Sequence, residues 1–160
     1  MELWYWDSIL FAAIIWAALL LLVDIKRIKE LLPVGLLSSV LFFSLGIYLE
    51  SIGLARFSNG FLTIFGTPFF HLVWTFAAGI LLLNYLQRNF SRKVLVVFMF
   101  SIFGLVLDVF SVMVGGHIHS SNYNFIHSFI IILTTTVFFV WIAEGLFEER
   151  IYGQADFRLK

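Results

Sequence analysis

Residues 94–127 read VLVVFMFSIFGLVLDVFSVMVGGHIHSSNYNFIH, a long apolar run with a single acid, followed by a polar segment that carries three of the four histidines of the chain. The apolar part, from about residue 94 to 114, has the roughly 20 residues that an α-helix needs to cross about 30 Å of hydrocarbon. The sequence therefore predicts a membrane-spanning helix here, with its polar continuation at one face of the membrane.

The composition of the whole chain favours a membrane protein over a soluble one. Of its 160 residues, 61% are apolar and 12% are charged, whereas a soluble domain keeps about 25% charged residues. The net charge is zero, so the chain offers no basic field for nucleic acid. It has no cysteine, which excludes thiolate catalysis and cysteine-ligated metal. We expect a single all-α domain over residues 1–160, embedded in a lipid bilayer.

Four further apolar segments predict helices, so we expect five transmembrane helices in total. The predicted spans run from about 9 to 23, 34 to 54, 68 to 86, 94 to 114 and 125 to 147. Trp4, Tyr5 and Trp6 precede the first span as an aromatic anchor at the interface. Pro33 is the last residue of the loop DIKRIKELLP and is suited to the first turn of the second helix, where its missing N–H costs nothing. The connection 55–67, with turn residues at Asn59 and Gly60, is too short to cross and is expected to lie in the interface.

The positions of Lys and Arg predict the orientation. Nine of the ten basic residues lie in the first loop, the third loop and the C-terminal tail, and only Arg56 lies on the opposite side. The nine are Lys26, Arg27, Lys29, Arg88, Arg92, Lys93, Arg150, Arg158 and Lys160. Because cytoplasmic loops carry the excess of basic residues, we expect the N-terminus outside and the C-terminus in the cytoplasm.

This orientation brings four polar residues to a similar depth near the outer ends of four helices. Glu50 and Asp108 lie about four and six residues below their outer helix ends, or about 6 and 9 Å. His71 and His127 lie near the outer starts of the third and fifth spans. We expect these four to form an outward-facing pocket, with Asp108 paired to His127 or Arg56 if its role is structural.

Helical spacing supports an inward direction for Asp108. Ser101, Gly104, Asp108, Ser111 and Gly115 follow one another at steps of three or four residues, which places them on one face of a helix. Such small and polar stripes face neighbouring helices in membranes. In the other half of the bundle, Asp24 and Glu144 lie near helix ends, where we expect them to reach water or to pair with Lys and Arg.

Histidine is also a metal ligand, and a divalent metal is the cofactor that this residue set suggests. Neutral imidazole suits zinc and related ions, and His117 and His119 show the alternating spacing of many metal sites, so the candidate ligands are His71, His117, His119 and His127. The competing interpretation is structural. It makes His117 and His119 solvated or interfacial loop residues at the rim, and His71 and His127 partners in hydrogen bonds between helices.

These patterns favour a non-enzymatic integral membrane protein whose pocket binds a small ligand, a cation or a lipid headgroup, in transport or sensing. Two alternatives stay open. A membrane-embedded hydrolase or transferase would act on lipid or peptide at the outer interface, with Glu50 and Asp108 as its paired acids. An accessory subunit or a homo-oligomer would use the polar stripes as contact surfaces for another membrane protein.

Several segments resemble a family of small five-helix membrane proteins from endospore-forming Firmicutes. These are VDIKRIKELLP after the first predicted span, GIYLESIGL at the end of the second, TPFFHLVW at the entry to the third, and the pattern from Asp108 through GGHIHSSNYN to His127. Members of that family are richer in Trp and often carry a Phe-Pro pair in the third span, which this chain lacks. The resemblance implies a multi-pass protein of the bacterial cytoplasmic membrane and implies no activity.

Overall fold

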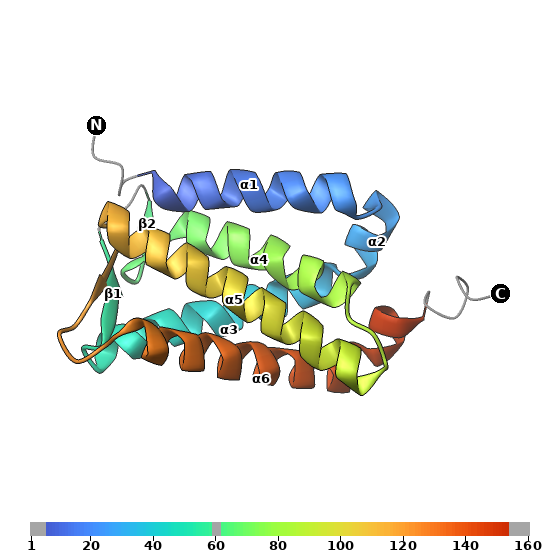
Figure 1. Ribbon diagram of the computed structural model, residues 1–160. Coiled ribbons are helices and arrows are strands. Elements are labelled where there is room, and N and C mark those ends of the chain that lie inside the picture. The colour runs from blue at the N-terminus through green and yellow to red at the C-terminus, as the bar shows by residue number, and fades with distance from the viewer. Residues whose placement is uncertain (1–5, 59–61, 154–160) are drawn as a thin grey trace.

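The described part of the computed structural model, residues 6–58 and 62–153, is mostly α-helical. Its helices are α1 (Asp7–Leu22), α2 (Ile25–Glu30), α3 (Leu32–Ser51), α4 (Phe69–Asn84), α5 (Phe90–Val114) and α6 (Phe125–Tyr152). The five long helices run side by side along one axis (Figure 1). The predicted anchor at Trp4 and Tyr5, the turn at Asn59 and Gly60, and the basic residues Arg158 and Lys160 lie outside the described residues.

Three of the five long helices are long and apolar enough to cross a membrane. These are α3, α5 and α6, with 20, 25 and 28 residues. The other two, α1 and α4, are apolar but have 16 residues each, which gives a length of about 24 Å against about 30 Å of hydrocarbon. The prediction of apolar helices in all five places is therefore confirmed, while the length criterion is met by three of them.

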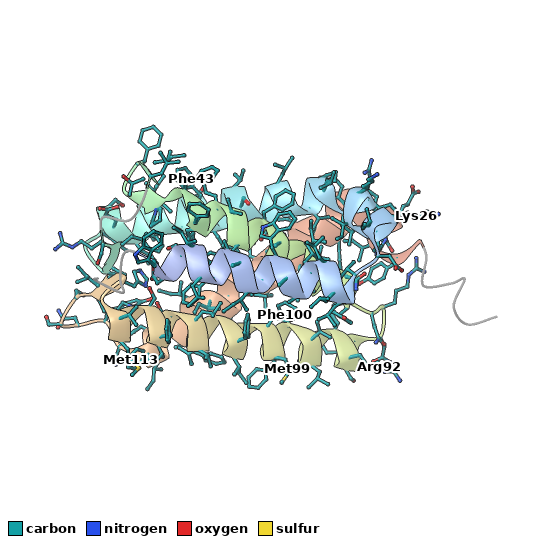
Figure 2. The ribbon with its side chains drawn as sticks, turned by 90° about the horizontal axis from the view of Figure 1, so that it is seen from above. Lys26, Phe43, Arg92, Met99, Phe100 and Met113 are labelled. Atoms are coloured by element: carbon teal, nitrogen blue, oxygen red, sulfur yellow. The ribbon has the colours of Figure 1, made fainter. Side chains whose placement is uncertain are left out.

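The outer faces of the bundle carry large apolar side chains that nothing in the described chain covers. Leu21 is 84% exposed, Met113 79% and Trp141 69%. Figure 2 shows Met99 and Met113 pointing away from the other helices on the free side of α5, whereas Lys26 and Arg92 lie at the opposite end from Met113. Exposed apolar surface of this extent is typical of a protein that is surrounded by lipid.

The helices form two groups that meet along the bundle. α4 packs between α1 and α3, and α5 packs against α6, while contacts between α5 and the α1–α4 group are sparse. The approach of α3 to α4 depends on Gly79, because a Cβ there would lie 2.3 Å from the Ser38 Cβ. The main hydrophobic core joins the groups at one end, around Leu19, Leu83 and Phe139. The other end has a much smaller core cluster.

We name the two ends by their residues. The basic end comprises α2, the start of α5 and the end of α6, and it holds Lys26, Arg27, Arg92 and Lys93. The histidine end comprises the start of α1, the end of α5 and the start of α6, together with the strands (Figure 1). It holds all four histidines.

Two connections that we expected to be loops pair as strands at the histidine end. β1 (Ala55–Phe57) runs antiparallel to β4 (His117–His119), with Ala55 opposite His119 and Phe57 opposite His117. β2 (Thr63–Ile64) and β3 (Thr67–Pro68) form a second, smaller antiparallel pair. The prediction missed β1 and β4 because each strand is only three residues long and its partner lies about 60 residues away in the chain.

The basic end differs from the prediction in two places. The expected loop after the first span contains α2, and the fifth helix continues beyond residue 147 to Tyr152 with a kink at Phe147, where φ is −135° and ψ is 24°. The added turn is fixed by burial, since Ile151 and Tyr152 are each 3% exposed. Pro33 lies in the first turn of α3, as its missing N–H predicts.

Candidate functional site: an Asp–His–His cluster at the histidine end

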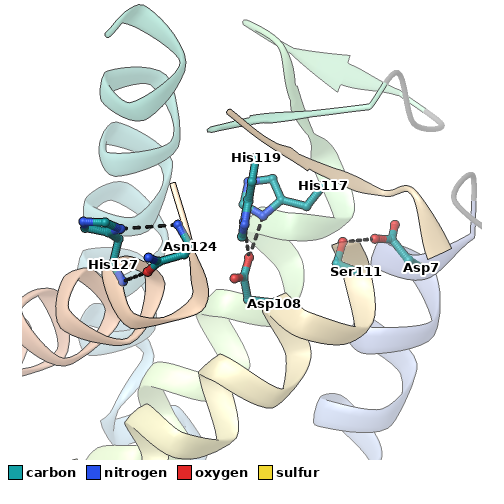
Figure 3. A network of polar contacts seen from close by, with 7 residues as sticks. All are labelled: Asp7, Asp108, Ser111, His117, His119, Asn124 and His127. Carbon is teal, nitrogen blue, oxygen red and sulfur yellow. Dashed lines mark hydrogen bonds and ion pairs between the residues drawn. The ribbon is translucent and has the colours of Figure 1, made fainter. Parts of the chain in front are cut away.

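Asp108 contacts two histidines that follow it in the chain. Its Oδ1 lies 2.6 Å from His117 Nδ1 and 3.3 Å from His119 Nε2 (Figure 3). The three side chains are largely buried, with exposed fractions of 11% for Asp108, 15% for His117 and 9% for His119. His117 and His119 lie in the connection after α5, as expected, but their side chains are not solvated. Asp108 also has different partners from the predicted His127 or Arg56.

The local backbone explains why these three side chains converge. α5 ends at Gly115, whose φ of 81° is a left-handed conformation that favours glycine, and the chain then turns into β4. Alternate residues of a strand point to the same face, so His117 and His119 project together while Ile118 projects away. Pairing with β1 holds that strand over the last turns of α5.

Aromatic rings fix the two imidazoles from outside. The Phe57 ring stacks on His117 with centroids 4.8 Å apart and planes 16° apart. The Tyr123 ring meets His119 edge-on at 4.6 Å. Burial lowers the pKa of His119, against the opposing effect of the Asp108 carboxylate, so its imidazole is neutral at neutral pH. Two held rings, one of them clearly neutral, are a suitable pair of metal ligands.

The geometry of the cluster fits a divalent transition metal. One ligand atom from each residue lies within 4.8 Å of the other two. Zinc bonds of about 2.0–2.2 Å at tetrahedral angles place ligand atoms about 3.3 Å apart, so the His117 contact of 2.6 Å would open and the two imidazoles would adjust to admit the ion. Two imidazoles and one carboxylate leave a fourth position for water or a ligand, as in catalytic zinc sites. Asp108 Oδ2 has no hydrogen-bond partner among the described residues, which leaves the carboxylate with spare capacity.

Comparisons with known proteins add no assignment. No protein-family model, curated protein or solved structure matches this chain. The resemblance to small five-helix membrane proteins of Firmicutes stays a prediction. The chemistry of the site therefore has to be argued from its own residues.

A cavity of about 160 Å³ lies against the cluster, inside the bundle. Residues of all five long helices line it, and Asp108, His117 and His71 belong to its wall. The His71 ring contacts Phe57 at 4.7 Å and Trp74 at 4.9 Å between centroids. His71 thus lies beside the cluster, but it does not belong to the group whose ligand atoms converge.

The other two predicted pocket residues lie elsewhere. Glu50 is exposed and lines a separate pocket with Arg56, on the far side of His119. His127 is exposed as well, and it closes a capping box with Asn124 at the start of α6 (Figure 3). The structure therefore brings together two of the four predicted pocket residues, His71 and Asp108, at the cavity inside the bundle.

Asp7 is a buried acid at this cavity that the sequence argument did not include. It is 7% exposed, and its Oδ2 accepts a hydrogen bond of 2.5 Å from Ser111 Oγ (Figure 3). The Ser8 backbone N–H donates to the other carboxylate oxygen. We began the first span at residue 9, which left Asp7 outside the membrane, although the polar stripe did predict that Ser111 faces a neighbouring helix. An acid in a first helical turn beside that stripe was the available signal.

Proposed function

We propose that the chain crosses a bacterial cytoplasmic membrane five times, with the histidine end outside. Seven described basic residues lie at the basic end and Arg56 alone at the histidine end, which agrees with the excess of positive charge in cytoplasmic loops. The shorter helices α1 and α4 would be accommodated by local thinning of the bilayer. A reporter fused to the C-terminus tests this: a cytoplasmic signal is expected, and an external signal would overturn the topology.

The proposed role is the binding of a divalent transition metal of the zinc class by Asp108, His117 and His119, on the outer side of the membrane. One observation supports it above the others: three side chains of the correct ligand types converge, and within residues 6–58 and 62–153 one carboxylate oxygen is left without a hydrogen bond. A bound cation would compensate the burial of the Asp108 charge in addition to the two imidazole contacts. The site would then serve in ligand recognition or sensing.

Metal-dependent hydrolysis is the second candidate. It is favoured by the fourth coordination position beside a cavity, since zinc lowers the pKa of a bound water to about 7. A hydrolase based on Glu50 and Asp108 as paired acids has no such support, because Glu50 does not line the cavity of Asp108. The acid that shares this cavity is Asp7.

The test is metal content and affinity in purified protein that carries an affinity tag without histidines. We expect one zinc per chain in the wild type. Asp108→Asn and His119→Gln should each lower the affinity at least 100-fold. His127→Gln is the matched control, because it removes an exposed histidine of the same end and should leave the affinity unchanged. Circular dichroism of each variant confirms that its helices are intact. Absence of bound zinc in folded wild-type protein, or an equal loss in the control, would refute the proposal.

A further inference from the structure

The cavity beneath the metal-ligand cluster extends from the histidine end toward the main core. It is lined along α5 from Phe100 to Ser111, a distance of about 16 Å at 1.5 Å per residue. Its far end is closed by residues such as Ser38, Leu82 and Phe139, next to the main core. A volume of about 160 Å³ is close to that of a cavity that accepts one benzene molecule, so there is room for one short segment of a hydrocarbon chain.

The deeper part of this cavity is apolar in effect, although it contains hydroxyl groups. Ser38 Oγ donates to the Thr75 carbonyl at 2.9 Å, Thr75 Oγ1 to the His71 carbonyl at 2.9 Å, and Thr136 Oγ1 to the Ile132 carbonyl at 2.7 Å. Each hydroxyl hydrogen is thereby used within the protein. The remaining wall consists largely of Phe and Leu side chains. Water has few partners there, and apolar cavities of about this size stay dry and bind small hydrocarbons such as benzene.

The part near Asp108 has the opposite character. Trp74 Nε1, Asp108 Oδ2 and Ser128 Oγ are buried, and none of them makes a hydrogen bond of standard geometry with the described chain. All three residues belong to the cavity wall. Ser128 lies close enough to interact with Asp108, without a well-aligned bond. Buried polar groups left unpaired cost about 1–3 kcal/mol each, so a polar partner at this end would be stabilising.

We propose that the cavity holds the first part of the chain of a single-chain lipid with an anionic head. The chain would enter the apolar part with about six carbon atoms, in analogy with the benzene-sized cavity, and the rest would leave through the open side of the cavity. A carboxylate or phosphate oxygen of the head would take the fourth position of the metal. The proposal therefore rests on the proposed metal site for its head and on the cavity for its chain.

Filling the cavity separates these two parts. Ala78 lines the cavity from α4, so Ala78→Phe places a ring in the space for the chain and leaves the metal ligands unchanged. Ala13→Phe is the matched control, because Ala13 is exposed on α1 and is absent from the cavity wall. Both variants are purified without a histidine tag, and their metal content and circular dichroism are measured first.

The probe is a long-chain fatty acid that carries a photoactivatable diazirine about six carbons from its carboxylate. We expect saturable crosslinking to peptides of α4 and α5, a decrease of at least fivefold in Ala78→Phe, and no change in Ala13→Phe. Metal chelation should weaken the binding about tenfold. Competition by a fatty acid or by an alkyl phosphate shows which anionic head is preferred.

The outcomes distinguish the two proposals. Equal crosslinking of Ala78→Phe and Ala13→Phe, in protein that retains zinc, would overturn the lipid proposal and leave the metal site standing. A second outcome is that the wild-type protein binds no zinc, yet Ala78→Phe abolishes the crosslinking seen in the wild type. This would support the cavity as the site of the chain and refute the metal as the partner of the head. A loss in Ala78→Phe together with sensitivity to chelation supports the proposal in full.

Discussion

The two ends of the bundle use charged residues in different ways. At the basic end, Glu144 accepts hydrogen bonds from Lys93 and from the Tyr152 hydroxyl, and the Arg88 guanidinium lies 5.3 Å from the centre of the Tyr152 ring. Arg27 donates to the backbone carbonyls of residues 150 and 151 at 2.5 Å. These groups surround the main hydrophobic core and hold the last turn of α6 against α2. Their charges stabilise the fold.

At the histidine end, the same kinds of group are left with unused capacity. Asp108 contacts two imidazoles with one oxygen, and its other oxygen has no hydrogen bond to the described part of the chain. The neighbouring space is a cavity instead of a core. The difference teaches where to look for function in a chain of this type. A buried charged group whose hydrogen bonds are all made stabilises the packing. A buried charged group with an unused acceptor oxygen beside a cavity is suited to binding a ligand.

The largest expected effect on stability comes from adding a single methyl group at Gly116, at the histidine end. A Cβ at Gly116 would lie 2.0 Å from Asp7 Oδ2 and 2.9 Å from Ser111 Oγ, so Gly116→Ala should displace Asp7 and lower the free energy of unfolding by up to about 3 kcal/mol. Gly145→Ala is the control, since nothing lies within 4 Å of its added Cβ, and alanine should stabilise α6 by up to about 1 kcal/mol. Thermal unfolding in detergent measures both. Similar shifts for the two variants would mean that the packing of Asp7 over Gly116 is unimportant.

The difference between the two ends predicts opposite outcomes for two isosteric substitutions, Glu144→Gln at the basic end and Asp108→Asn at the histidine end. Glu144→Gln removes the partner of Lys93, and because both side chains are about a quarter exposed, we expect a loss of about 1–2 kcal/mol, below the 3–5 kcal/mol of a fully buried pair. Its zinc content should not change.

Asp108→Asn should cost up to about 1 kcal/mol in metal-free protein, because the amide oxygen can still contact the two imidazoles while the charge that strengthens these contacts is lost. Its zinc affinity should be lost. The two variants are compared by unfolding in the presence of a chelator and by zinc titration. If Asp108→Asn proved the more destabilising of the two without metal, the distinction between the ends would be wrong.

The smallest expected effect is at His127. Its Nδ1 accepts a hydrogen bond of 3.3 Å from the Asn124 backbone N–H as part of the capping box. His127→Ala should therefore lower the free energy of unfolding by about 0.5 kcal/mol, at the low end for a lost cap. Asn124→Ala removes both bonds from the cap side chain and should cost about 1 kcal/mol. Unchanged stability in Asn124→Ala would show that the capping box is not important for the start of α6.

Prediction from sequence succeeded where the signal is local. Apolar runs gave the long helices, and Pro33 marked the first turn of α3. Glu144 was expected to reach water or to pair with Lys or Arg, and it pairs with Lys93. Counting residues from helix ends placed Asp108 and His71 in one layer, and both line the same cavity. The same counting failed for Glu50 and His127, because depth along a helix does not tell which way a side chain points around it.

The amino-acid sequence by itself determined the class of the protein: apolar segments of helical length must pair their backbone groups internally, and a chain with few charges has to be covered by lipid. Only the tertiary structure decided the site. His117 and His119 point at Asp108 because a three-residue strand pairs with Ala55–Phe57, a contact between two connections that no local pattern encodes. Asp7 contacts Ser111 because the end of α5 returns to the start of α1 after more than a hundred residues. Such long-range contacts depend on packing between elements, so they become visible only once the helices are assembled.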